Sequence, residues 1–472
     1  MAQVTDLPRN ETGIQAACGI LKQRFGERFH TAEAIREQHA HTTTWLLNQP
    51  PDAVIFAAST SEVSEIVKVC ATHDVPIIPF GTGTSLEGHV NAPAGGISID
   101  LSQMDKVLAV NQEDLDCVIQ PGVTREALNT ELRDRGLFFP IDPGANASLG
   151  GMAATRASGT NAVRYGTMKD NVIALEAVMA DGRVIRTGRR ARKSSAGYDL
   201  TRLLVGSEGT LGLITEITLR LHGIPEAISS ARCSFPSVEV ACQAVMAVIQ
   251  YGIPVARIEL LDATQVRASN AYSQLDLPET PLLLLEFHGS EAGVEEQAQM
   301  FGEIASEFGA EGYTATTSTE ERSALWKARH DAYWAALQLR PGAKGISTDV
   351  CVPISRLADC VSAAQDKLAA LGFTAPIVGH VGDGNFHSLV LVDQNSNDEM
   401  AKAREYVSWL NELAISMDGT CTGEHGIGQG KMPYLRKELG DEAVDTMVFL
   451  KTALDPQNIL NPGKVLGYSV SV

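Results

Sequence analysis

Four ionisable side chains near the C-terminal end of the sequence could hold a metal ion and move a proton. His380 and His387 lie in the segment HVGDGNFH, between the apolar runs 376–378 and 389–392. Because Asp-Gly between two strand-like runs favours a tight turn, we expect a hairpin with the histidines on opposite legs. Two imidazoles facing each other across a turn could form half of a metal site, although an isolated pair of histidines is more often structural.

A second segment, GEHGIG, adds a carboxylate and a further imidazole at Glu424 and His425. Two histidines and one glutamate are a common ligand set, and they leave coordination positions open for a substrate. Adjacent side chains do not easily point the same way. One of the two could therefore bind the metal while the other faces the reacting carbon.

Three glycine-rich segments could hold a phosphate-containing cofactor. The first, PFGTGTS at 79–85, follows a predicted strand and offers several backbone N–H groups and hydroxyls that suit a pyrophosphate. It is neither a Rossmann fingerprint, because the third glycine falls at Gly88, nor a P-loop, because no Gly-Lys-Ser/Thr follows. Alone it could be a tight turn, but two more such segments follow at 148–166 and 205–215.

In this order the three segments resemble the PCMH-type FAD-binding domain of vanillyl-alcohol oxidase-type flavoproteins. The resemblance implies that the first segment holds the pyrophosphate and that the others line the rest of the FAD. We expect non-covalent FAD, because residues 143–166 contain neither His nor Cys and His89 is interpreted as a solvated loop residue. The implied cofactor-binding residues are Pro79, Gly81, Thr82, Gly83, Thr84, Ser85, Leu86, Pro143, Ser148, Gly151, Met152, Ser158, Gly159, Thr160, Arg164, Tyr165, Gly166, Glu208, Gly209, Gly212, Ile214 and Asn461.

HxGDGNxH, GEHGIG and LNPGK together resemble the C-terminal domain of FAD-linked D-2-hydroxy acid dehydrogenases. Segments 157–168 and 347–353 look most like the D-lactate dehydrogenases of that group. The resemblance implies that His380, His387 and Glu424 bind a divalent metal (Zn, Mn or Fe) and that His425 is the catalytic base. It also implies that Arg329 binds the substrate carboxylate, although an arginine in WKARH would more often lie on a solvated face.

The predicted reaction is oxidation of a small D-2-hydroxy acid. The first candidate is oxidation of D-lactate to pyruvate. Tyr333 and Ser347 offer no cation for a second carboxylate, although Lys327 and Lys344 leave D-2-hydroxyglutarate open. Glycolate as the substrate, a direct oxidase reaction with oxygen, and a non-catalytic flavin-binding subunit also stay open. Nothing resembles an NAD site, haem or iron–sulfur ligation, so we expect a quinone or an electron-transfer protein as acceptor. The sequence does not indicate which residues the bulky Arg156 contacts.

Composition narrows the class of protein. A net charge of −19 argues against nucleic acid as a partner, because phosphate binding needs a basic face. The sequence contains no run of 18 uncharged apolar residues, so it predicts no transmembrane helix. Residues 1–10 do not resemble a signal peptide. The eight cysteines form no CxxC pair, which suits reduced thiols in the cytoplasm. We expect a cytoplasmic protein that could lie peripherally at the inner face of the membrane and could form a homodimer.

The elements that must position these residues indicate an α+β fold. We expect two or more domains, because 472 residues are more than one hydrophobic core usually supports. We expect an N-terminal helical segment at 1–48, a two-part FAD-binding domain at 49–224, and a C-terminal substrate domain at 225–472 with an antiparallel sheet flanked by helices. Predicted strands are 54–58, 75–80, 96–99, 116–120, 255–261, 281–287, 313–317 and 346–352. Predicted helices are one capped by Ser61, then 124–136, 291–308, 319–338, 354–371 and 397–417.

Overall fold

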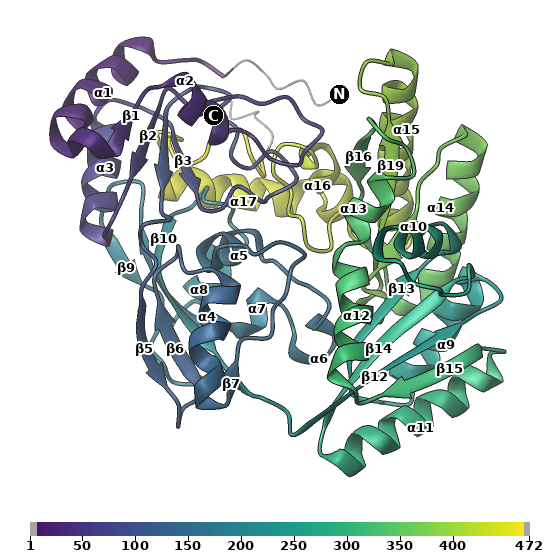
Figure 1. Ribbon diagram of the computed structural model, residues 1–472. Coiled ribbons are helices and arrows are strands. Elements are labelled where there is room, and N and C mark those ends of the chain that lie inside the picture. The colour runs from purple at the N-terminus through teal and green to yellow at the C-terminus, as the bar shows by residue number, and fades with distance from the viewer. Residues whose placement is uncertain (1–6, 467–472) are drawn as a thin grey trace. The chain divides into compact units, whose positions relative to one another are not determined.

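The computed structural model describes residues 7–466, which form two compact units (Figure 1). Within the described residues, unit 1 comprises 7–158, 166–224 and 424–466, and unit 2 comprises 159–165 and 225–423. Helices combine with mainly antiparallel sheets, so the fold is α+β as predicted. The chain passes from unit 1 to unit 2 after Ile224, and residues 159–165 also belong to unit 2.

Unit 1 begins with a four-stranded sheet in the order β1-β2-β4-β3. These strands are β1 (Phe29–His30), β2 (Ala53–Phe56), β3 (Ile77–Phe80) and β4 (Ile97–Asp100), and both β2 and β3 run parallel to β4. Helix α3 (Thr60–Thr72) connects β2 to β3 and buries Val63, Ile66, Val67 and Cys70, the residues at helical spacing. Its N-cap is Ser59 rather than the predicted Ser61, because the Ser59 side chain accepts from the Glu62 backbone N–H.

The first 48 residues are part of this unit rather than a separate helical segment. Helix α1 (Glu11–Phe25) contributes Ile14 and Leu21 to the core around the sheet, and β1 pairs with β2. A short helix, α2 (Glu33–Gln38), follows. The sequence shows helical character here but does not show which core the apolar face joins.

A second, antiparallel sheet of unit 1 has the order β5-β6-β10-β8-β9. Its strands are β5 (Val107–Asn111), β6 (Asp116–Ile119), β8 (Val172–Val178), β9 (Val184–Arg186) and β10 (Leu213–Arg220). Helices α4 (Arg125–Leu132) and α5 (Leu149–Thr155) pack their apolar side chains into the same core. The small-residue tract therefore contains a helix, α5, where the sequence shows no apolar periodicity, because small residues, Gly150 and Ala153, share its buried face with Leu149 and Met152.

Residues 424–466 belong to unit 1, whereas the sequence analysis counted them with the C-terminal domain 225–472. The Ile77 backbone N–H donates to the Ile459 carbonyl over 2.7 Å, and the Asn461 N–H donates to the Ile77 carbonyl over 2.8 Å. Ile459 and Leu460 are buried in the core of the first sheet. Helices α16 (Met432–Leu439) and α17 (Asp441–Leu454) precede this contact. A backbone bridge to a strand nearly 400 residues earlier has no local sequence signal.

Unit 2 is built on an antiparallel sheet in the order β15-β12-β14-β13-β18-β19-β16, with β17 also paired to β19. The strands are β12 (Ala227–Ser234), β13 (Val255–Leu261), β14 (Leu282–Gly289), β15 (Glu311–Thr316), β16 (Lys344–Ser347), β17 (Val350–Cys351), β18 (Ile377–Gly379) and β19 (Asn385–Val392). The helices are α6 (Ala162–Tyr165), α9 (Val238–Gln250), α10 (Ala263–Ser273), α11 (Glu291–Glu307), α12 (Thr319–His330), α13 (Ala332–Leu337), α14 (Leu357–Leu371) and α15 (Asn397–Ser416). Helix α11 packs against β12 and β14 (Figure 1).

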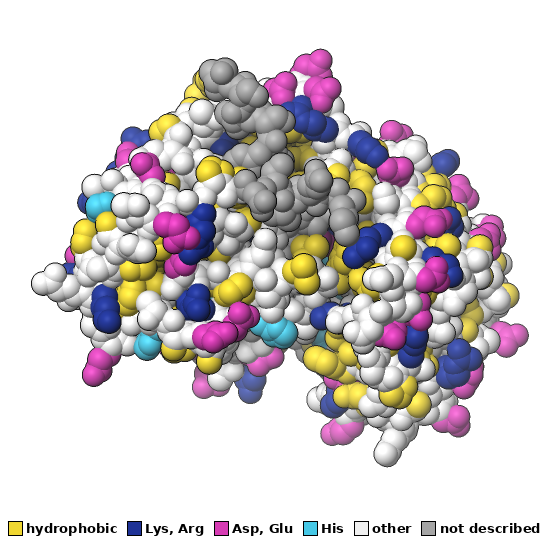
Figure 2. All heavy atoms as spheres, turned by 90° about the horizontal axis from the view of Figure 1, so that it is seen from above, with side chains coloured by type: hydrophobic (Ala, Val, Ile, Leu, Met, Phe, Trp, Pro, Cys, Tyr) yellow, Lys and Arg dark blue, Asp and Glu magenta, His cyan; other side chains and the backbone are white. Residues whose placement is uncertain are grey.

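Two predicted elements of unit 2 are divided in the structure. The single helix expected at 319–338 is broken at Asp331, which separates α12 from α13. The strand expected at 346–352 is two short strands, β16 and β17, because both pair with the longer β19 at different places. On the face shown in Figure 2, Lys and Arg side chains of the described residues lie interspersed with Asp and Glu.

Candidate active site

The predicted hairpin is confirmed, and it brings the two histidines of unit 2 together. Strands β18 and β19 are antiparallel, with Val378 opposite His387. Between them a short 3-10 turn ends at Gly384, whose φ of 80° and close approach to the Val352 carbonyl admit only glycine without strain. The ring centroids of His380 and His387 are 5.5 Å apart. The Asp-Gly turn thus faces the imidazoles toward each other.

A buried carboxylate on β13, Glu259, holds two of the predicted site residues. Its Oε1 lies 2.7 Å from His380 Nδ1, and its Oε2 accepts from Arg329 Nε over 2.7 Å. Arg329 Nη2 is also 2.6 Å from Oε2. Arg329 is only 9% exposed, so it is not the solvated side chain that a local interpretation of WKARH favours.

Opposing effects act on the pKa of Glu259. Complete burial alone would raise the pKa of this carboxyl, but the charges and hydrogen bonds of His380 and Arg329 outweigh burial and lower it. Glu259 therefore stays ionised inside the sheet. A Glu259 carboxylate at His380 Nδ1 favours a proton on that nitrogen, which puts the lone pair of the ring at Nε2.

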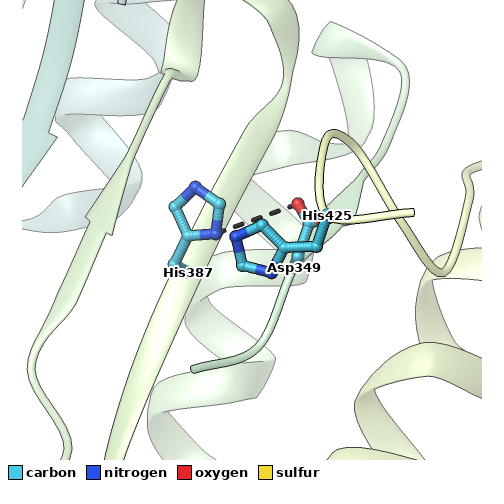
Figure 3. A group of neighbouring side chains, drawn as sticks. All are labelled: Asp349, His387 and His425. Atoms are coloured by element: carbon cyan, nitrogen blue, oxygen red, sulfur yellow. Dashed lines mark ion pairs between the residues drawn. The ribbon is translucent and has the colours of Figure 1, made fainter. Parts of the chain in front are cut away.

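His387 is held in a similar way, but by a backbone carbonyl instead of a carboxylate. Its Nδ1 lies 2.9 Å from the Thr348 carbonyl, which can only accept, so Nδ1 carries the proton and Nε2 the lone pair. Asp349 Oδ1 lies 3.8 Å from the same nitrogen, an ion pair drawn dashed in Figure 3. Metal-binding histidines usually donate their second nitrogen to a carboxylate or carbonyl in this manner. Both histidines have this arrangement.

Asp349 is fully buried and links the hairpin to the segment that leads to Glu424 and His425. It accepts from Asn385 Nδ2 over 2.8 Å and from Thr422 Oγ1 over 2.9 Å. A Cβ on Gly423 would collide with Asn385, so the chain passes close to this site. Glu424, the next residue, has its Cα about 3.8 Å from that of Gly423, because the peptide bond fixes this spacing.

Glu208 of unit 1 supports the loop that follows His425. Its two carboxylate oxygens accept from the backbone N–H groups of Ile427 (2.7 Å) and Gly428 (2.8 Å). His89 Nε2 lies 3.1 Å from Oε2. Burial alone would raise the pKa of Glu208, but His89 and the two N–H donors lower it. His89 is 6% exposed, so its interpretation as a solvated loop residue is wrong: it is drawn inward by this buried carboxylate.

The three glycine-rich segments meet inside unit 1. A Cβ on Gly81 would collide with Ser148 Oγ, and a Cβ on Gly209 would collide with the ring of Pro79. The Ser148 N–H donates to Thr82 Oγ1 over 3.3 Å. The first segment therefore contacts both of the others at points where a Cβ on the glycine would collide with the neighbouring side chain.

Several polar groups at these segments fit a nucleotide cofactor. The hydroxyls of Ser85 and Ser148 are buried and have no hydrogen-bond partner among residues 7–466, an arrangement that is costly unless a ligand completes it. A cavity of about 680 Å³ adjoins Gly81 and Thr82. Met152 and Ile214, in contrast, have side chains in the apolar core, so only their backbone could face a cofactor.

Part of the predicted cofactor set belongs to unit 2. Residues 159–165 leave unit 1, and Arg164 Nη1 donates to the carbonyls of Pro254 (2.8 Å) and His288 (3.0 Å). The Tyr165 hydroxyl lies 2.7 Å from His288 Nδ1. Both side chains therefore anchor this segment to the sheet of unit 2.

Arg156 and Asn461 connect loops of unit 1. Arg156 ends α5 with a φ of 58°, and its Nη2 donates to the Val205 carbonyl over 3.1 Å, so it joins the second glycine-rich segment to the third. Asn461 Nδ2 donates to the carbonyls of Glu208 (2.8 Å) and His89 (3.2 Å).

Sequence reasoning missed Glu259 and Asp349. A signal was present for the first, since Glu259 is the lone carboxylate in a predicted strand, VARIELL, whose residues apart from Arg257 are otherwise apolar. Asp349 lies in the segment 347–353, which carried the resemblance, but no spacing rule pairs it with a histidine 38 positions later.

Two families together match most of the chain. The FAD binding domain family matches residues 51–188, and the family "FAD linked oxidases, C-terminal domain" matches residues 224–465. Within residues 7–466, no helix combines the length and the apolar character that a bilayer span requires.

Relatives and a solved structure agree with these matches. The chain is 52% identical to a probable mitochondrial D-lactate dehydrogenase of Danio rerio over 93% of this chain and 89% of that protein. It is 49% identical to a mitochondrial D-lactate dehydrogenase [cytochrome] of Arabidopsis thaliana (88% and 73%) and 37% identical to a glycolate oxidase subunit of Bacillus subtilis (93% and 94%). Substrate-bound p-cresol methylhydroxylase shares the fold, with a TM-score of 0.80 at 16% identity over 98% of this chain and 99% of that one. With both domains matched and relatives this similar over most of their length, the chain belongs to the FAD-linked oxidases with an FAD binding domain and a FAD-linked oxidase C-terminal domain.

Proposed function

We propose that this FAD-dependent enzyme oxidises D-lactate to pyruvate. The observation that carries the proposal is the identity of 52% and 49%, over most of the chain, to relatives that are named D-lactate dehydrogenases. The presence of His380, His387, Glu424 and His425 supports catalysis rather than a non-catalytic flavin-binding subunit.

We propose that His380, His387 and Glu424 bind a divalent metal ion, zinc, manganese or iron. Support comes from the donors: each imidazole carries its proton on Nδ1, so each offers Nε2 to a cation. Two imidazoles and one carboxylate suit all three metals and leave positions for a substrate.

The residues of the chain then have separate tasks. A bound divalent ion would supply a positive charge that lowers the pKa of the substrate hydroxyl, and FAD would supply the two-electron oxidant. Glu259 engages Nε and Nη2 of Arg329, so we assign Nη1 to the substrate carboxylate. His425 accepts the hydroxyl proton, a task that imidazole performs near neutral pH.

The surroundings of Arg329 support a monocarboxylate with a short side chain. Tyr333 packs against an apolar cluster that includes Leu389 and Leu391. Lys327, considered as an anchor for a second carboxylate, forms an ion pair with Asp331 and is 73% exposed in its side chain. These contacts favour D-lactate over D-2-hydroxyglutarate.

Glycolate is the second candidate substrate, because a relative that is 37% identical is named a glycolate oxidase subunit. For the electron acceptor we propose a quinone or an electron-transfer protein; oxygen is the alternative. Non-covalent FAD, a homodimer and a cytoplasmic location stay predictions, and acid release of the flavin from the polypeptide tests the first of them.

Anaerobic mixing of the purified protein with single acids tests the substrate. We expect D-lactate to remove the oxidised-flavin absorbance fastest among D-lactate, L-lactate, glycolate and D-2-hydroxyglutarate. A higher kcat/KM for any of the other three would overturn the assignment. Rapid reoxidation of the reduced flavin in air would identify an oxidase instead of a dehydrogenase.

A further inference from the structure

We propose that Glu259 is a positioning residue that couples metal binding to substrate binding. The proposal rests on the proposed function, because it takes His380 as a metal ligand and Arg329 as the carboxylate-binding residue. One carboxylate contacts both side chains, one oxygen for each.

The contact with His380 sets the direction of a metal-binding nitrogen. Glu259 Oε1 accepts the Nδ1 proton over 2.7 Å, which holds the ring plane and keeps the lone pair on Nε2. A carboxylate at this position also makes the imidazole a stronger donor to a cation. Without it, the ring could rotate or place its proton on Nε2.

The contact with Arg329 sets the direction of the guanidinium. Nε and Nη2 both lie within 2.7 Å of Oε2, and two contacts on a planar group fix its plane. Within the described part of the chain, Nη1 has no hydrogen bond or ion pair. Arg329 can therefore present Nη1 to a second carboxylate in a fixed orientation.

The position of Glu259 has no other evident function. The neighbouring residues Ile258, Leu260 and Leu261 are all buried apolar side chains of the same strand. A fully buried carboxylate is strongly unfavourable unless it is paired, and removing one partner leaves the other charge uncompensated. An apolar residue would serve the sheet better, so the carboxylate is explained by its two partners.

The variant Glu259→Gln tests whether one carboxylate must serve both contacts. An amide offers one acceptor oxygen and one NH₂ donor, so it cannot accept from both His380 and Arg329. We expect the affinity of the metal-depleted protein for Zn²⁺ or Mn²⁺ to fall about 10- to 100-fold, the usual effect of losing such a partner. We also expect the KM for D-lactate to rise, while FAD content stays unchanged because the contacts of Gly81, Ser148 and Gly209 that join the glycine-rich segments lie in unit 1.

Glu286→Gln is a matched control. Glu286 is also a buried carboxylate, on the neighbouring strand β14, and it also pairs with a histidine (His288 Nε2, 2.8 Å) and an arginine (Arg257, 3.6 Å). The two variants therefore carry a similar folding cost, and only Glu259→Gln should lose metal affinity. Equal loss in both variants would mean a structural role and would overturn the proposal.

Glu259→Asp covers the case in which Glu259→Gln does not fold. It keeps the charge but is shorter by one carbon–carbon bond, about 1.5 Å, so it cannot reach both partners. We expect a folded protein with reduced metal affinity and a raised KM; wild-type values for both would overturn the proposal.

Metal binding is measured without substrate, so a wild type that binds Zn²⁺ but prefers another acid would refute only the D-lactate assignment. A wild type that binds neither ion would overturn the metal site and this coupling together.

Discussion

Glu208→Gln should loosen the loop that carries Glu424 and His425, although the sequence assigned Glu208 to the cofactor. In the structure both carboxylate oxygens accept backbone N–H groups, from Ile427 and from Gly428. A glutamine retains one acceptor oxygen, so one of these buried N–H groups would face an NH₂ donor. The variant is nearly isosteric, so packing should be preserved.

The magnitude follows from the bonds that are lost. A hydrogen bond to a charged group contributes about 1.5–3 kcal/mol, and a buried donor left without an acceptor costs about 1–3 kcal/mol. The loop should therefore open more easily by about 2.5–6 kcal/mol. Since about 1.4 kcal/mol corresponds to a factor of ten, amide exchange at Ile427 and Gly428 should accelerate about 10²- to 10⁴-fold.

Hydrogen-exchange mass spectrometry of peptides that cover residues 424–431 measures this effect. Glu216→Gln serves as the control, because Glu216 lies on β10 of the same unit and pairs with Arg186 rather than with this loop. Flavin reduction should slow in Glu208→Gln, since the base at His425 is displaced, while FAD content changes little. Unchanged exchange combined with loss of FAD would refute the reasoning and restore Glu208 as a cofactor ligand.

Three further predictions concern the metal, the base and the pH dependence of stability. His387→Ala should purify without metal but with FAD; elemental analysis that finds wild-type metal content would contradict its assignment as a ligand. His425→Ala should keep both cofactors and slow anaerobic flavin reduction by about 10²- to 10⁴-fold, so loss of its metal would show that the assigned roles are wrong. Burial raises the pKa of Asp262 to about 6 from 3.8, so the folded protein binds a proton that the unfolded chain releases and its stability falls as pH rises across this interval. Asp262→Asn should abolish that decline in urea unfolding experiments, and an unchanged slope would contradict the assignment.

Local sequence determined the parts of this protein that depend on near neighbours. The Asp-Gly turn between two apolar runs predicted the hairpin that faces His380 toward His387, because turn geometry is set within a few residues. Likewise, glycines of the cofactor segments stand where another residue approaches their backbone too closely for a Cβ, as Ser148 does at Gly81 and Pro79 at Gly209. Such requirements are visible in residue type alone.

Tertiary structure alone decided which distant groups compensate one another. Glu259 stands 70 positions before Arg329 and 121 before His380, and a buried charge has no preferred partner in sequence. His89 appeared solvated because its counter-charge, Glu208, is more than 100 residues away. Residues 424–466 belong to unit 1 through the backbone bridge at Ile77 and the hydrogen bonds that Glu208 accepts from Ile427 and Gly428. Burial makes each of these pairings strong, and burial is a property of the completed fold, since only the packed chain removes the water that would otherwise satisfy every charge.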